Sequence, residues 1–99
     1  MVPFSVRTIA WKNTHLVNIC DSDLIGKTLM EGRLKMHISK EFFGGQLVDE
    51  DEALQMLRES AIVSLAGEKC VKMALSNKLG SQQAVRMIEG VPFLMIYKF

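Results

Sequence analysis

The sequence contains few cysteines, prolines and aromatic residues, and these shortages exclude several classes of protein. Two of the 99 residues are cysteine, two are proline and 7% are aromatic. Two cysteines cannot build the dense disulfide framework of a small secreted protein. No apolar run approaches the roughly 20 residues of a membrane span, and the N-terminus lacks the basic start and apolar stretch of a secretion signal. We therefore expect a cytoplasmic protein with no membrane partner and with both thiols reduced.

The remaining composition is typical of one folded domain. The apolar fraction is 48% and the charged fraction 23%, close to average globular usage. A chain of this length buries one core, so we expect a single domain over residues 1–99. The net charge is only +1, but the charges alternate in blocks. The segment 27–40 has a net charge of +3, whereas the segment 41–59 has a net charge of −5.

Hydrophobic periodicity predicts strands at both ends of the chain. Residues 4–11 and 16–20 are rich in β-branched and aromatic side chains and are separated by a polar break, which indicates an antiparallel hairpin. Residues 33–39 alternate between polar and apolar, as in a strand with one buried face. Residues 93–99 are almost continuously apolar, which predicts a strand buried on both faces.

Two consecutive helices are predicted between these groups of strands, at about 50–66 and 68–79. Asp49 and Glu52 have the spacing of a capping box at the start of the first helix, and Gly67 is a natural end for it. Strands at both ends with helices between them indicate an α+β fold. We expect one largely antiparallel sheet with the two helices packed on one of its faces.

Motifs for catalysis, metal binding and nucleotide binding are missing. Zinc sites usually contain closely spaced cysteine or histidine pairs, and none occurs here. We predict no metal site, no cofactor and no catalytic residue. Cys20, followed by Asp21, is the single reactive candidate. A catalytic thiol needs a base or a positive environment, whereas Asp21 and Asp23 are acidic. The alternative role for Cys20, a small buried apolar residue, is common for free cysteine.

The cationic segment 27–40 contains the candidate binding site. Arg33, Lys35 and His37 lie on one face of the predicted strand, and Lys27 and Lys40 flank it. Such side chains bind phosphates, and each contact makes the affinity depend on salt. The alternative is an ordinary solvated sheet face. No basic strand is interleaved with aromatic residues in the way that a stacking platform for RNA needs.

An ordered set of short motifs resembles one known family. The motifs are Cys20-Asp21 at a strand end, Leu24–Thr28, Phe42–Gly45, Leu65–Glu68 and Gly90–Pro92. Spread over nearly the whole chain, they resemble a small family of uncharacterised archaeal proteins, domain of unknown function 424. The resemblance implies a stand-alone archaeal cytosolic protein and brings no known activity, substrate or cofactor. Phe93 and Ser64 stand where the family pattern has histidine and asparagine, which argues against an enzyme.

Three functions are open on this basis. A binding module for RNA or a ribonucleoprotein is favoured by the cationic segment and by the lack of catalytic motifs. The second is a protein–protein adaptor or a self-associating protein, for which adaptable methionines could supply the surface. The third is an enzyme that uses Cys20. The methionines in question are Met30, Met36, Met56, Met73, Met87 and Met95.

Overall fold

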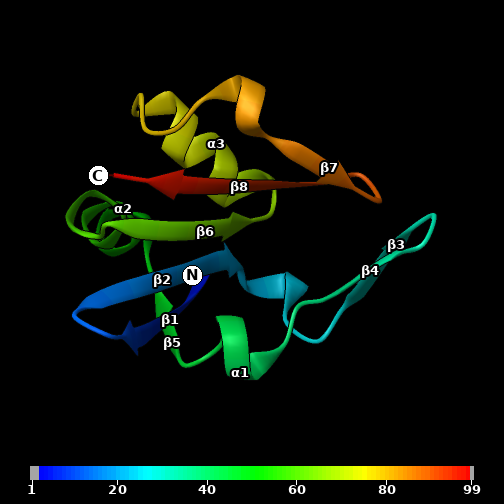
Figure 1. Ribbon diagram of the computed structural model, residues 1–99, viewed down its shortest axis with the longest axis horizontal. Helices are drawn as coiled ribbons and strands as arrows, with labels where there is room; N and C mark the ends of the chain where they lie inside the picture. Colours follow the sequence, from blue (N-terminus) through cyan, green and yellow to red (C-terminus); the bar gives the residue numbers. More distant parts are fainter. Residues whose placement is uncertain (1–2, 99) are drawn as a thin grey trace.

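A six-stranded sheet, a separate two-stranded hairpin and three α-helices make up the computed structural model, which describes residues 3–98 (Figure 1). The strands are β1 (Phe4–Trp11), β2 (Thr14–Asp21), β3 (Thr28–Glu31), β4 (Leu34–His37), β5 (Gln46–Val48), β6 (Ile62–Ala66), β7 (Arg86–Ile88) and β8 (Val91–Tyr97). The helices are α1 (Lys40–Phe43), α2 (Glu50–Glu59) and α3 (Glu68–Ser76), with short 3-10 turns η1 (Ser22–Leu24) and η2 (Gln82–Ala84). The predicted α+β class is confirmed.

The large sheet has the strand order β5-β1-β2-β6-β8-β7. Its pairs are antiparallel except β2 and β6, which run parallel, so the prediction of a largely antiparallel sheet is confirmed. The prediction of a single sheet is wrong, because β3 and β4 pair with each other and project from the body (Figure 1). Within residues 3–98, no helix has the length and apolarity that a bilayer crossing requires.

The predicted first helix is too long, because α2 ends at Glu59 and the next residues form strand β6. Ser60 is already extended, with ψ 143°, and its hydroxyl donates to the carbonyl of Met56 at 2.6 Å. The Lys98 ammonium donates to the carbonyls of Leu57 and Arg58, two acceptors that the end of α2 leaves free. A residue near the C-terminus of the chain therefore provides hydrogen bonds to the last turn of α2.

One face of the large sheet, here called the helix face, is covered by α2 and α3, as predicted (Figure 1). Leu57 of α2 and Ala74 of α3 are fully buried against Leu65 of β6 and Leu94 of β8. Capping supports α2, since the Asp49 carboxylate accepts from the Glu52 amide at 2.9 Å. This layer buries most of the apolar side chains and forms the main core of the protein.

The opposite face, here called the open face, is covered only in part. Helix α1 packs against β1 and β2, and a second apolar cluster lies beneath it. That cluster consists of Cys20, Leu24, Ile38, Phe43 and Ala66. The predicted burial of both faces of β8 is wrong, because Met95 is 48% exposed and Tyr97 57% exposed. Phe99, the predicted end of this strand, lies outside the described residues.

Candidate functional site

The predicted cationic residues lie on and around the hairpin β3–β4, and all of them are exposed. Lys35 and His37 project from the same face of β4, because side chains alternate along a strand. Arg33 lies in the turn at the hairpin tip, Lys27 lies at the hairpin base, and Lys40 begins α1. The hairpin thus brings Lys35 and His37 together and leaves the other three at its ends.

The face that carries Lys35 and His37 contains no carboxylate. Register places Thr28 opposite His37 and Met30 opposite Lys35, so these four side chains share one face. The hydroxyl of Thr28 lies 3.0 Å from Nδ1 of His37, and this contact fixes the imidazole against the neighbouring strand. Met30 is 54% exposed beside Lys35. This face therefore presents the ammonium of Lys35, the imidazole of His37 and the apolar side chain of Met30 to solvent.

The hairpin tip is held by the turn between β7 and β8. The amide of Met30 donates to the Glu89 carboxylate at 2.6 Å, and the amide of Glu89 donates to the Glu31 carboxylate at 3.3 Å. Glu89 has a φ of 49°, a conformation that non-glycine residues adopt mainly in tight turns. These reciprocal contacts use both carboxylates near the tip, and they hold an otherwise projecting hairpin against the body.

Cys20 is fully buried beneath α1, in the apolar cluster of the open face. Burial, with the carboxylates of Asp21 and Asp23 adding to it, raises the pKa of its thiol to about 12. A nucleophilic cysteine requires the opposite shift, since the thiolate is the reactive form. The environment of Cys20 therefore favours a packing role over the reactive one.

Asp21 closes the N-terminus of α3. Its two carboxylate oxygens accept from the amides of Lys69 and Cys70 at 3.0 and 2.9 Å, which are donors that a helix start otherwise leaves unpaired. A side chain at Gly67, where φ is 116°, would place Cβ 2.4 Å from the Asp21 carboxyl carbon. The amide of Gly67 donates to Pro92 at 2.9 Å. Three of the sequence motifs thus meet here, and they serve packing and capping.

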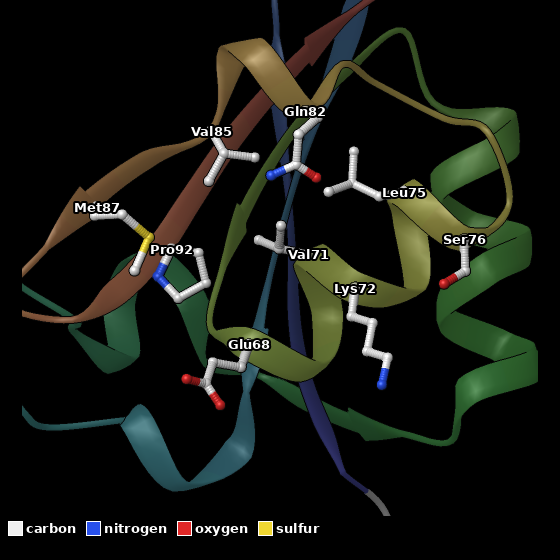
Figure 2. Close-up of a pocket in the computed structure, with 9 residues that line it drawn as sticks. All are labelled: Glu68, Val71, Lys72, Leu75, Ser76, Gln82, Val85, Met87 and Pro92. Carbon is white, nitrogen blue, oxygen red and sulfur yellow. The ribbon is translucent and has the colours of Figure 1, made fainter.

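A groove of about 480 Å³ lies between α3 and the segment that runs through η2 and β7. Figure 2 shows Val71 and Leu75 of α3 facing Val85, with Met87 and Pro92 at one side. Glu68 and Lys72 extend outward from the helix at its margin (Figure 2). The groove is mainly apolar and borders β7, which is an edge strand of the large sheet.

Register arranges the open face in three rows of side chains that cross the strands. The first row is Ile9, Leu16, Ile62 and Tyr97, and the second is Arg7, Asn18, Ser64 and Met95. The third row is Leu47, Ser5, Cys20, Ala66, Phe93 and Arg86. The first row is apolar, the second is mostly polar, and the third belongs largely to the buried cluster. Ser64 and Phe93 both lie on this face.

Side chains of the second and third rows fix helix α1 to the sheet, and the Ser5 hydroxyl of the third row donates to the carbonyl of Phe43 at 2.9 Å. Asn18 donates to the carbonyl of Phe42 at 2.9 Å, and Arg7 donates to the carbonyl of Lys40 at 3.1 Å. This contact leaves the ring of Phe42 outside, where it is 49% exposed. The sequence predicts neither Phe42 nor Tyr97 as a site residue, and it predicts Met95 only as one of the methionines of an adaptable protein-binding surface. Met95 and Tyr97 lie within a continuous apolar segment, so no local signal separates exposed from buried positions there.

The fold and surface define the protein as a small α+β domain with one helix-covered and one partly open sheet face. The chain belongs to the family described as protein of unknown function (DUF424), whose model matches residues 10–99. It is similar in fold to a crystal structure of an uncharacterized conserved protein from Methanopyrus kandleri, with a TM-score of 0.72 and 23% identity over 95% of this chain and 90% of that one. No curated protein matches the sequence.

Proposed function

We propose that this chain is a cytoplasmic, archaeal RNA-binding module and that the hairpin β3–β4 makes its first contacts with RNA phosphates. The observation that carries the proposal is the exposed hairpin face, where Lys35 and His37 project side by side without a carboxylate among them. Arg33 extends the cationic surface to the tip, and the acids at that tip are engaged by backbone amides. A projecting two-stranded ribbon can bring such side chains to RNA phosphates without entering the deep, narrow major groove of an A-form helix.

Salt dependence tests this proposal. Binding of a fluorescent RNA stem-loop is measured by anisotropy over a series of salt concentrations, with the wild type and with the double variant Arg33→Ala/Lys35→Ala. The slope of log affinity against log salt is negative, and each lost phosphate contact should reduce its magnitude by about 0.7 to 0.9. The variant should therefore bind more weakly at low salt and should be less sensitive to salt than the wild type.

The matched control removes the same charge from another surface. Lys69→Ala/Lys72→Ala on α3 also removes two positive charges, and both lysines are exposed like the residues they are compared with. This control should keep the wild-type slope. Equal losses in the two double variants would mean that overall charge alone drives binding, and an absence of binding at low salt would remove the RNA proposal.

The apolar groove between α3 and β7 favours a second candidate function, which is self-association or the docking of a protein. Met87 is 50% exposed at this groove, and the adjoining strand β7 has only one strand partner among the described residues. An edge strand beside an apolar groove is the arrangement that extended peptides use to join a sheet. Sedimentation velocity over a wide concentration range, compared with Met87→Lys, tests self-association. A monomer at every concentration would remove that form of the candidate.

A further inference from the structure

We propose that the open face binds the bases of single-stranded RNA, with Phe42, Met95 and Tyr97 as its contact residues. This inference rests on the proposed function and adds the class of RNA. The three side chains, here called the platform residues, are each about half exposed, at 49, 48 and 57%. Every base has a flat apolar surface, so exposed aromatic side chains on a sheet can stack against RNA without a fixed sequence.

The platform residues are held in place by neighbouring side chains. The Phe42 ring packs edge-on against the buried ring of Phe43, with 5.5 Å between centroids and 69° between planes. The hydroxyl of Tyr97 lies 3.8 Å from the Met95 sulfur, so these two side chains lie along the same side of β8. Contacts that already restrain the side chains reduce the entropy that binding must remove.

The charges around the platform favour an anionic ligand. Asp21 is the only carboxylate in the strands of the large sheet within residues 3–98, and it caps α3 on the helix face. Arg7 and Arg86 instead belong to rows of the open face. Lys40 and Glu41 of α1 offset each other, and most remaining acids lie in α2 or just before it. The open face is therefore more positive than the helix face.

Polar groups in the second row distinguish this surface from a dry protein interface. Arg7 lies at one end of that row and Ser64 near the other. The Ser64 hydroxyl is half-buried and makes no hydrogen bond with any residue of the described chain. This free hydroxyl, which lies between Asn18 and Met95 in the second row, could bond to a base edge while the platform residues stack against base faces.

The cationic hairpin joins the body beside the third row of the open face. Met36 of β4 and Phe93 of β8 both pack against the buried cluster that contains Cys20. The hairpin thus leaves the body at the third row of the open face, next to the row that holds Met95. A single strand could therefore place phosphates along the hairpin and the following bases over Met95 and Tyr97. A rigid duplex hides its base faces and could use only the hairpin.

The test compares a labelled oligouridylate of roughly ten nucleotides, within the length range of sheet-based single-strand sites, with a blunt RNA duplex of equal length. The single strand should bind more tightly. Tyr97→Ala and Phe42→Ala should each weaken its binding about fivefold to a hundredfold, the range for losing one stacked base, without changing the salt slope. Tyr97→Phe keeps the ring and should keep the affinity. Gln55→Ala, at an exposed position of α2 on the helix side, should have no effect.

Different results separate the inference from the proposed function. Equal binding of duplex and single strand, unaffected by the Tyr97 and Phe42 substitutions while Arg33→Ala/Lys35→Ala still lowers the salt slope, would overturn the platform alone. No RNA binding at low salt would overturn both. A wild-type dimer that Tyr97→Ala converts to a monomer would assign the open face to self-association and overturn the platform. Thermal unfolding of each variant excludes loss of the fold as the cause.

Discussion

Strand β8 carries apolar residues on both faces of the large sheet, but the layers that cover these two faces differ. On β8, Leu94 is 1% exposed on the helix face, whereas its neighbour Met95 is 48% exposed on the open face. Helices α2 and α3 cover the first face along its length, and α1 covers only part of the second. Exposure along this strand is therefore decided by the layers around it. The helix face holds the fold together, and we assign the ligand to the open face.

The largest difference between the faces should appear on truncating a core residue. Leu65→Ala on β6 removes a fully buried side chain from the main core, and we expect a loss of about 2 to 5 kcal/mol in unfolding free energy. Urea unfolding measures this loss. A loss below about 1 kcal/mol, the size of an ordinary substitution, would mean that the helix face is less tightly packed than described.

The junction between β6 and α3 should tolerate substitution almost as poorly. Gly67→Ala forces a left-handed backbone on a side chain and moves the Asp21 carboxylate off the start of α3. We expect a loss of about 1 to 3 kcal/mol in unfolding free energy. Gly90→Ala is the matched control, since its φ is also positive, at 78°, but nothing lies within 4 Å of the added Cβ. Equal losses at the two positions would show that the contact with Asp21 contributes nothing.

Ionisation of the buried Cys20 thiol, in the third row, should lower the stability of the protein at alkaline pH. Burial raises the pKa of Cys20 from 9.0 to about 12, so the unfolded chain loses this proton at a lower pH than the folded one. The contribution is complete below 9.0 and declines as pH rises toward about 12. Urea unfolding should therefore show a smaller decline with alkaline pH in Cys20→Ala than in the wild type. Parallel declines would mean that the thiol is exposed to water.

The smallest effect on stability is expected on the open face. Tyr97→Ala and Met95→Ala remove side chains that are about half exposed, so each should lower the unfolding free energy by only about 0.5 to 1 kcal/mol. Thermal unfolding measures this change. Losses as large as that of Leu65→Ala would show that the open face belongs to the core, and the contrast between the faces would fail.

The sequence predicts the fold class because strong local patterns agree with it. The hairpin of β1 and β2, the alternation around β4 and the cap at Asp49 each follow from a few neighbouring residues. The strand β6 was missed because Leu57, Ala61 and Leu65 have helical spacing, whereas Val63 and Leu65 also satisfy the period of a strand. The contact of Lys98 with the end of α2, which connects distant parts of the chain, leaves no local signal.

The candidate site was predictable only in its cationic part. Lys35 and His37 alternate with apolar residues, so their shared face can be read from the sequence. Met95 and Tyr97 occur in a strand in which all seven residues are apolar, so no neighbouring residue shows which side of the strand is uncovered. Phe42 is exposed because Asn18 and Arg7 bind the carbonyls of α1. Those contacts join strands and a helix that lie far apart in the sequence.

Amide chemical-shift mapping with single-stranded RNA tests most directly whether the hairpin and the open face bind one ligand. The labelled protein is titrated with oligouridylate at low and moderate salt. We predict salt-sensitive shifts at Lys35 and His37, together with shifts at Phe42, Met95 and Tyr97 that persist when salt weakens the hairpin contacts. Shifts confined to α2 and α3, or no shifts at low salt, would contradict the account.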